Sequence, residues 1–392
     1  MGHNGSNGRW LGVGRSAAPD AQAAGDAAAA QALSGDDARL IAVFSSGSYD
    51  LPELLAAIRR RSEDTPLIGC STAGEIATGG PGDASVVVVA LGGDGFSVAT
   101  AAAEGVAGRL RAAGAEVASC ASPVEPLPHR VMMLLTDGLA GDQGEIVRGA
   151  YSVLGAGVPL VGGCAGDDLK MRGTYQFHGD RVLRDAVVGA AIASDAPFGI
   201  GVRHGWRKVG APMVVTHSEN SRVHLLDGRP ALDVYLERLE APEEARTDPA
   251  AFTRFALHHP LGLSRRSTEE HVRFVAEADF AERSLVCIAE VPRGALAWFM
   301  KGDADSVLHA TDEACGDALA ALEGRPPLGL IAFDCIARRG VLGDEGIGHE
   351  VSRVAEHASG APVAGFYTYG EIARTRGVSG FHNQTLVVLA VG

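Results

Sequence analysis

The chain has 392 residues, of which 46% are hydrophobic and 21% charged, and this balance is typical of a globular protein. Its length predicts two domains of ordinary size, each able to bury most of its apolar surface. The formal net charge of −14 argues against a nucleic-acid partner or an anionic membrane, because either requires clustered lysine and arginine.

The six cysteines show neither a CxxC motif nor close pairing, and they lie at positions 70, 120, 164, 287, 315 and 335. Because several of them fall in apolar stretches, we expect reduced, buried thiols and no zinc site. The first residues lack the apolar core of a secretory signal, and no uncharged apolar run reaches the ~18–20 residues of a spanning helix. We therefore expect a cytoplasmic protein that does not enter a membrane.

The N-terminal third of the chain predicts a tail followed by strands and helices. Residues 1–35 are expected to form a flexible tail, in which the alanine-rich residues 17–33 can form a helix. A strand is predicted at residues 40–44, and a helix with arginines in its last turn at residues 51–61. Consecutive valines predict a strand buried on both faces at residues 85–91.

The rest of the chain repeats this succession of elements. The middle third predicts a strand at 131–135, a helix at 143–154, a glycine turn at 162–168, and strands at 174–178 and 186–193. The last third predicts a helix at 304–322, a strand at 328–333, a helix at 347–358 and a final strand at 385–391.

One stretch occurs three times, each time with proline first, glycine three residues later and an acid nine residues later. The copies begin at Pro66, Pro159 and Pro362, and their acids are Glu75, Asp168 and Glu371. Such self-similarity indicates one supersecondary unit used repeatedly. The predicted fold is α/β (α+β), with two domains of repeated βαββ-type units whose mixed sheets are flanked by helices. The expected boundaries are 36–222 and 223–392.

The glycine turns after the strands are the predicted ligand site, since ligands gather beyond the carboxyl ends of strands in open α/β sheets. Backbone amides of these turns can hold a carboxylate, and the acids can hold an ammonium group. Arg338 can hold a carboxylate or form a structural ion pair with one of the acids. An amino-acid-like ligand fits this mixture of charges. The candidate ligand-binding residues are Cys70, Ser71, Thr72, Glu75, Asp137, Gly163, Cys164, Asp168, Asp334, Arg338, Tyr369, Glu371 and Asn383.

Motifs in four places resemble the FIST family, with its N-terminal and its C-terminal domain. They are Gly69-Cys70-Ser71-Thr72-Ala73-Gly74-Glu75, Gly162-Gly163-Cys164-Ala165-Gly166-Asp167, Asp334-Cys335-Ile336-Ala337-Arg338-Arg339, and Gly365-Phe366-Tyr367-Thr368-Tyr369-Gly370-Glu371 with Asn383-Gln384-Thr385. The resemblance implies an intracellular bacterial sensory protein that binds a small ligand, such as an amino acid or related metabolite. It also implies that a histidine kinase, cyclase or other partner receives the signal in trans.

A cysteine hydrolase is an alternative function. Cys164 lies in a G-x-C-x-G stretch after an apolar strand, as a nucleophile elbow would place it, with His178 or His204 downstream. A nucleophile elbow leads directly into a helix, whereas residues 170–178 contain glycine and alternate like a strand. The corresponding positions of the other copies hold Ser71 and Tyr367, so we expect no enzymatic activity.

Haem binding, as in a nitric-oxide-type gas sensor, is a further alternative, because some relatives of the family resemble haemoproteins. The haem would need an axial histidine or cysteine in an apolar pocket. The histidines considered for this role are His204, His217, His258, His259, His349 and His382. No pattern in the sequence selects one of them.

Overall fold

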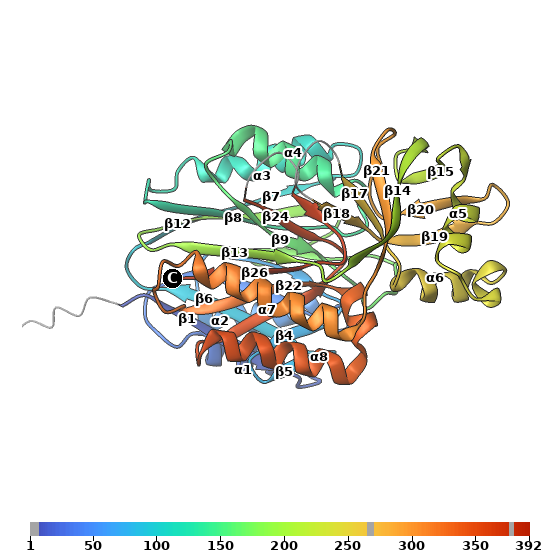
Figure 1. Cartoon of the computed structure of the whole chain (residues 1–392). Helices are drawn as coiled ribbons and strands as arrows, with labels where there is room; N and C mark the ends of the chain where they lie inside the picture. Colours follow the sequence, from blue (N-terminus) through green and yellow to red (C-terminus); the bar gives the residue numbers. More distant parts are fainter. Residues whose placement is uncertain (1–7, 265–269, 376–379) are drawn as a thin grey trace, which may run out of the picture.

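The computed structural model describes residues 8–264, 270–375 and 380–392, and all statements on the structure refer to these residues. Within them the strands form four sheets, three of mixed direction and one antiparallel. Helices pack on the sheets from outside (Figure 1). The predicted α+β class with mixed sheets flanked by helices is confirmed.

The first sheet has the order β1-β6-β2-β3-β10-β11. Its strands are β1 (Trp10–Ser16), β2 (Ala38–Ser45), β3 (Leu67–Ser71), β6 (Val86–Gly92), β10 (Gln176–His178) and β11 (Arg181–Leu183). Helices α1 (Ala21–Ala32) and α2 (Leu51–Ser62) cover its outer face. Asp20 and Asp50 cap these helices by accepting hydrogen bonds from the backbone of their first turns.

The second sheet has the order β25-β24-β9-β8-β12-β7. Its strands are β7 (Phe96–Glu104), β8 (His129–Thr136), β9 (Leu160–Cys164), β12 (Ala186–Ser194), β24 (Glu371–Arg374) and β25 (Phe381–His382). Helices α3 (Leu110–Ala118) and α4 (Gln143–Leu154) cover it, and the 3-10 helix η1 (Ser119–Ala121) follows α3.

The third sheet has the order β13-β26-β22-β23-β4-β5. Its strands are β4 (Glu75–Ala77), β5 (Gly80–Gly82), β13 (Phe198–Arg203), β22 (Gly329–Cys335), β23 (Val363–Thr368) and β26 (Leu386–Val391). Helices α7 (Ala304–Ala320) and α8 (Ile336–Ala358) cover it. Helix α8 is kinked at Gly343, whose φ of 66° lies in the left-handed region.

The fourth sheet lies at one end of the molecule, between β13 and α7 in the chain (Figure 1). Its strands are β14 (Arg207–Glu219), β15 (Arg222–Leu226), β16 (Arg229–Pro230), β17 (Leu261–Ser264), β18 (Glu270–Arg273), β19 (Val275–Asp279), β20 (Ser284–Cys287) and β21 (Leu296–Lys301). It packs with α5 (Ala231–Arg238), η2 (Glu243–Arg246) and α6 (Pro249–Leu257) around a core of its own.

Each of the first three sheets contains a parallel pair of strands joined by a helix. The pairs are β2–β3 across α2, β8–β9 across α4, and β22–β23 across α8. The second strand of each pair begins one residue after Pro66, Pro159 or Pro362, where a missing backbone N–H disrupts no ladder. A later strand, β6, β12 or β26, lies antiparallel to the first strand of the pair.

Short hairpins link the three sheets in a cycle. The hairpin β4–β5 follows β3 in the chain but pairs with β23 of the third sheet. The hairpin β10–β11 follows β9 but pairs with β3, and β24–β25 follows β23 but pairs with β9. The third sheet also takes β13, which precedes the expected domain boundary at 222/223. Strands from both predicted domains therefore complete one another's sheets, and the boundary itself stays a prediction.

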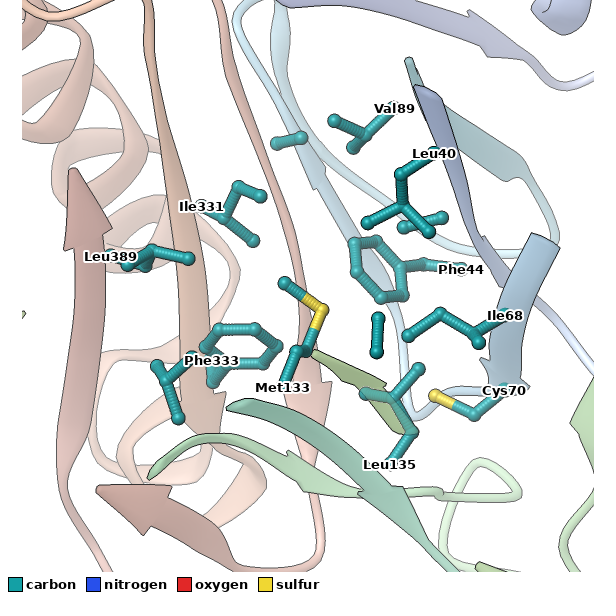
Figure 2. Close-up of a cluster of buried hydrophobic side chains, with 14 of the residues drawn as sticks. Leu40, Phe44, Ile68, Cys70, Val89, Met133, Leu135, Ile331, Phe333 and Leu389 are labelled. Carbon is teal, nitrogen blue, oxygen red and sulfur yellow. The ribbon is translucent and has the colours of Figure 1, made fainter. Parts of the chain in front are cut away.

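The inner faces of the three sheets share one hydrophobic core (Figure 2). Phe44 of β2 packs against Phe333 of β22 and Phe366 of β23, with ring centroids 6.3 and 4.8 Å apart. Met133 and Leu135 of β8 enter the same cluster from the second sheet. Because the outer faces are covered by helices, these strands are apolar on both faces, as their continuous apolar runs predict.

The flexible tail predicted for residues 1–35 is wrong for residues 10–16, which form β1, whereas the alanine-rich helix expected within residues 17–33 is present as α1. Strand β1 pairs with β6 over its whole length, and α1 packs beneath it. Gly12 and Gly14 permit this packing, since a Cβ atom there would lie 2.0 and 1.9 Å from the carbonyl oxygens of Ala32 and Ala28. The glycine content that indicates flexibility in sequence thus reflects a close strand–helix contact. Residues 1–7 lie outside the described part of the chain.

Among the described residues, no helix combines the length and the apolar character that crossing a membrane requires.

Candidate functional site

The three glycine turns predicted as the ligand site meet at the centre of the molecule. Each turn donates a backbone hydrogen bond to the residue before a hairpin strand of another unit: Ser71 N to Tyr175 O (2.9 Å), Cys164 N to Gly370 O (2.8 Å) and Tyr367 N to Gly74 O (2.8 Å). Further bonds join Gly166 N to Ser71 O (3.0 Å) and Ala73 N to Tyr367 O (3.0 Å). We call this arrangement the turn junction.

The turn junction is tightly packed. The Ser71 hydroxyl donates to Gly166 O (2.8 Å) and accepts from Tyr175 N (2.9 Å). A Cβ atom on Gly163 would lie 2.7 Å from the Thr368 side chain, so glycine is required there. The Cys70 thiol points into the shared core (Figure 2). These predicted site residues therefore hold the turns together.

Two of the predicted acids, Glu75 and Glu371, have the same surroundings. The Glu75 carboxylate accepts hydrogen bonds from the Thr72 hydroxyl and from Ser85 N and Oγ (3.1 and 2.6 Å). The Glu371 carboxylate accepts from Thr368 Oγ1 (2.5 Å) and from Thr385 N and Oγ1 (3.0 and 2.7 Å). In the first and last units, the acid thus links its turn by hydrogen bonds to the residue before β6 or before β26.

Both carboxyl groups are fully buried. Burial raises the pKa of each from 4.5 to about 7, although the hydrogen bonds from the neighbouring hydroxyls act in the opposite direction. All the hydrogen-bond partners of these acids belong to the fold itself, so the structure gives them a structural role.

The third predicted acid, Asp168, does not occupy the corresponding place. Opposite the second parallel strands, Glu75 pairs with Phe366 and Glu371 with Gly163, whereas Gln176 pairs with Cys70. Gln176 therefore takes the place of the acid in the middle unit, because residues 167–175 form an additional loop before β10. Asp168 lies in this loop, exposed, 3.2 Å from Lys170 Nζ.

The middle unit builds a polar corner around Asp137, which follows β8. Its Oδ1 accepts from Leu139 N (2.9 Å) and Thr174 Oγ1 (2.7 Å), and the side chain is 8% exposed. Gln176 Nε2 donates to Thr174 Oγ1 (3.1 Å), and Gln143 Nε2 donates to Asp137 O (2.8 Å). We call Asp137, Gln143, Thr174 and Gln176 the Asp137 corner.

Three elements bring the Asp137 corner together. Gln143 is the first residue of α4, which begins there because Asp142 accepts a hydrogen bond from Gly144 N (2.9 Å). Gln176 is the first residue of β10, and Asp137 directly follows the last residue of β8. Sequence reasoning identified Asp137 but missed Gln143, Thr174 and Gln176, because neutral amides and hydroxyls carry no charge pattern.

Two acceptors of the Asp137 corner have no partner among the described residues, namely the Oε1 atoms of Gln143 and Gln176, which are both buried. The amide of Gln143 cannot be reversed, since its Nε2 donates to the carbonyls of Asp137 and Gly141. A buried acceptor without a donor costs about 1–3 kcal/mol. The corner thus offers a carboxylate and two free oxygens, a set suited to an ammonium group.

Tyr369 fixes the loop of residues 167–173 beside the Asp137 corner. Its hydroxyl donates to Asp167 and accepts from Leu169 N (2.6 Å). Asp167 also accepts from the backbone N of residues 171, 172 and 173, at 3.0, 2.7 and 3.1 Å. The side chains of Leu169 and Met171 are 61% and 58% exposed on this loop.

Arg338 forms a buried ion pair, one of the two roles that the sequence left open. Its Nε lies 2.8 Å from Asp334 Oδ1, and its Nη2 donates to Glu350 and to Thr311 Oγ1 (2.9 Å). Burial and the charge of Glu350 raise the pKa of Asp334 well above its usual value, although the Arg338 guanidinium acts in the opposite direction.

Among the residues that the structure describes, no histidine is hydrogen-bonded to Cys164, as a nucleophile would need. Burial raises the pKa of its thiol to about 12, and the hydroxyl of Thr136 lies 3.2 Å from its sulfur. The described bonds of the two candidate histidines lie elsewhere: His178 Nε2 is 3.2 Å from Thr100 Oγ1, and His204 Nδ1 accepts from Trp206 N. Strand β9 leads into the 167–175 loop, not into a helix.

Among the described residues, no hydrogen bond joins Asn383 or the candidate haem ligands to the Asp137 corner. Asn383 is buried, and its Oδ1 has no partner in the described residues. His382 is bonded to Ala373 O (2.9 Å), and burial lowers its pKa to about 4. The other candidates lie on separate elements, with His217 on β14, His349 on α8, and His204, His258 and His259 on connecting segments.

No group of three or more histidine, cysteine or acidic side chains within the described ranges is placed to hold a metal ion.

The fold and the turn junction define an α+β protein with interlocked sheets and one polar corner beside its central turns. The chain belongs to the FIST family: the FIST N domain matches residues 39–229 and the FIST C domain matches residues 231–374. The resemblance seen in the motifs is thereby confirmed. FIST domains are associated with sensory signal transduction and small-ligand binding, and the family is not typically enzymatic.

Several relatives match nearly the whole chain, and one matches about a third of it. The uncharacterized protein Rv0628c of Mycobacterium tuberculosis is 27% identical over 393 residues, covering 96% of this chain and 97% of that protein. The uncharacterized protein Mb0898c of Mycobacterium bovis is 26% identical over 396 residues, with the same coverage. The uncharacterized protein MJ1623 of Methanocaldococcus jannaschii is 28% identical over 154 residues, covering 37% of this chain and 30% of that protein.

Proposed function

We propose that this protein is a cytoplasmic sensor of a small ligand with an ammonium group, such as an amino acid, and that the ammonium group binds at the Asp137 corner. The observation that carries the proposal is the pair of unpartnered buried oxygens, Gln143 Oε1 and Gln176 Oε1, linked by hydrogen bonds to Asp137. An ammonium group has three donors and no acceptor, which matches a carboxylate with two amide oxygens.

The comparison with the other predicted acids supports this choice. Glu75 and Glu371 each accept one hydrogen bond from their own turn and two from the residue before the unit's last strand, and Asp334 is paired with Arg338. Asp137 is 8% exposed, and its neighbours Gln143 and Gln176 each have an unpartnered amide oxygen in the described residues. The packed residues of the turn junction would then keep the Asp137 corner in position; they are Cys70, Ser71, Thr72, Gly163 and Cys164.

The loop of residues 167–173 is the proposed route of the signal. It is held by the contact of Tyr369 with Asp167 and presents Leu169 and Met171 to solvent. Exposed apolar side chains beside a ligand site suit contact with a second protein. A histidine kinase, cyclase or other partner acting in trans would bind this loop and respond when its conformation changes.

A thermal-shift screen tests the proposal, with amino acids, simple amines and carboxylates as ligands. A ligand at ~100 times its dissociation constant stabilises the folded state by about 2.7 kcal/mol, which raises the melting temperature by degrees. We expect ligands with an ammonium group to raise it and their N-acetylated forms to have no effect. The Asp137→Asn variant should lose the shift, and Asp168→Asn, on the nearby loop, should keep it. Equal shifts in both variants would exclude the Asp137 corner.

A further inference from the structure

The loop of residues 167–173 surrounds one carboxylate with backbone donors. Asp167 accepts hydrogen bonds from the backbone N of Met171, Arg172 and Gly173, at 3.0, 2.7 and 3.1 Å. Successive backbone N–H groups that converge on one point form a concavity that binds anions. We call these three N–H groups the anion nest. In this structure the carboxylate in the anion nest belongs to the chain itself, because Asp167 is the first residue of the same loop.

The anion nest favours the charged form of a carboxyl group. Asp167 is only 7% exposed, and this burial raises its pKa. Hydrogen bonds from the Tyr369 hydroxyl and from the anion nest outweigh the effect of burial, so the pKa of Asp167 lies below its usual value. The exposed side chain of Arg172 adds a positive charge to the same loop. The surroundings of Asp167 are therefore suited to a carboxylate.

The anion nest adjoins the Asp137 corner on two sides. Gly173, its last residue, is followed by Thr174, whose hydroxyl donates to Asp137 Oδ1 (2.7 Å). On the other side Tyr369, whose hydroxyl donates to Asp167, packs against Gly138; a Cβ atom on that glycine would lie 3.0 Å from Tyr369 Cβ. Donors suited to a carboxylate thus lie next to acceptors suited to an ammonium group, which include the two unpartnered buried amide oxygens of the corner.

The backbone of the loop is strained. Asp168, Leu169 and Met171 have φ angles of 55°, 59° and 52°, in the left-handed region that residues other than glycine seldom adopt. Such conformations cost free energy and persist only where other contacts hold them. The contacts here are those of Asp167 with the anion nest and those of the Tyr369 hydroxyl with Asp167 and Leu169 N. Without the Asp167 contacts, the loop can relax.

We propose that the anion nest binds the carboxylate of the ligand and that Asp167 is the chain's own competitor for this place. The ammonium group of the same ligand lies at the Asp137 corner, so the inference rests on the proposed function and narrows its ligand class to amino acids with a free carboxylate. Asp167 leaves the nest when the ligand binds, and the loop then loses the contacts that hold Leu169 and Met171. Asp167 therefore acts as an autoinhibitory group that couples binding to loop movement.

Acetate tests the carboxylate site without an ammonium group. In the native chain Asp167 competes for the anion nest, and we expect acetate to leave the melting temperature where chloride at equal ionic strength leaves it. In Asp167→Ala we expect acetate to raise the melting temperature by several degrees, and neutral acetamide to have no effect. Asp168→Ala is the matched control, because it removes the neighbouring exposed acid, and it should behave like the native chain.

Titration calorimetry with glycine, which carries only the two charged groups, tests the competition. We expect Asp167→Ala to bind glycine about tenfold or more tightly than the native chain, because the fraction of molecules with an open anion nest rises. Asp167→Asn, which keeps an acceptor but no charge, should also bind more tightly. Adding Asp137→Asn to Asp167→Ala should abolish glycine binding and preserve the effect of acetate.

The outcomes separate this inference from the proposed function. Equal or weaker glycine binding in both Asp167 variants, folded by circular dichroism, would overturn the role of Asp167 as a competitor. No effect of acetate on Asp167→Ala would overturn the carboxylate site, even if methylamine stabilises the native chain and so supports the Asp137 corner. An effect of acetate on Asp167→Ala, with no binding of methylamine or glycine by any variant, would support the carboxylate site and contradict the ammonium site.

Discussion

At the scale of single residues, the buried acids Glu75 and Glu371 show how one side chain can hold a turn. Each carboxylate satisfies a threonine hydroxyl within its turn and two donors at the start of the unit's last strand. Removing such a group leaves several buried donors without an acceptor, and each of these costs about 1–3 kcal/mol. These acids should therefore matter for stability wherever the ligand binds.

Glu371→Ala is expected to lower the free energy of unfolding by about 3 kcal/mol, because three donors lose their acceptor. Urea denaturation monitored by fluorescence measures the change. Asp168→Ala removes the exposed acid from the corresponding position of the second sequence copy and should change stability by less than about 0.5 kcal/mol. Similar losses in both variants would contradict the structural role assigned to Glu371.

The same acids predict a dependence of stability on pH. Their pKa values of about 7 in the folded state exceed the usual 4.5, so between these values the folded chain binds more protons than the unfolded one. The contribution of each acid is fully present below pH 4.5 and is lost as the pH rises through 7. The slope is at most about 1.4 kcal/mol per pH unit for each group. Glu371→Gln should flatten this fall in denaturation curves recorded from pH 4.5 to 8, and an unchanged slope would show that Glu371 is not responsible.

At the scale of elements, the ion pair of Arg338 connects the segments of α8 before and after its kink. Arg338 precedes the kink at Gly343 and Glu350 follows it, and both side chains are buried with Asp334 at the end of β22. A buried charge that loses its partner is strongly destabilising. The kink is therefore held by an ion pair across it as well as by the backbone of Gly343.

Arg338→Met is expected to destabilise the protein by about 3–5 kcal/mol, because two buried acids lose their cation. Arg339→Met tests the neighbouring arginine, which forms a bidentate pair with the largely exposed Asp83 and donates to Ala73 O (3.1 Å), and should cost less, about 1–2 kcal/mol. Guanidinium denaturation of both variants measures the difference. Comparable losses of unfolding free energy in the two variants would mean that the buried ion pair of Arg338 contributes no more to stability than the pair of Arg339.

At the scale of the whole molecule, the exchanged hairpins make the three sheets depend on one another. Strand β3 needs β10 from the middle unit, β9 needs β24 from the last unit, and β23 needs β4 from the first. The shared core also takes side chains from all three sheets (Figure 2). We therefore expect the three sheets to form one cooperative unit.

A fragment of residues 1–206 tests this interdependence. It retains the first two helix-linked pairs but lacks β22, β23, β24 and β26. We expect no cooperative thermal transition and no near-ultraviolet circular dichroism, because the β4–β5 hairpin loses β23 and β9 loses β24. A sharp transition in the fragment would show that the first two units fold independently.

The core elements were predicted well because their signals are local and strong. The strand predicted at residues 40–44 lies within β2, and the helix predicted at residues 143–154 coincides with α4. Strands covered on both faces are apolar throughout, which makes them visible in the sequence. The hairpins β4–β5 and β24–β25 were missed, since two to four residues leave no periodic pattern.

The amino-acid sequence by itself determined most strand and helix segments of the shared core, although not β1, and it also determined the three glycine turns and the family. Only the tertiary structure decided which polar groups are buried or open. Counting nine residues from each proline identifies Glu75, Glu371 and Asp168, but strand pairing puts Gln176 in the place of Asp168. The physical reason is that hydrogen-bond partners lie far away in the chain, 95 residues for Ser71 with Gly166 and 202 for Tyr369 with Asp167. Such partners are set by the packing of whole sheets, which no local pattern contains.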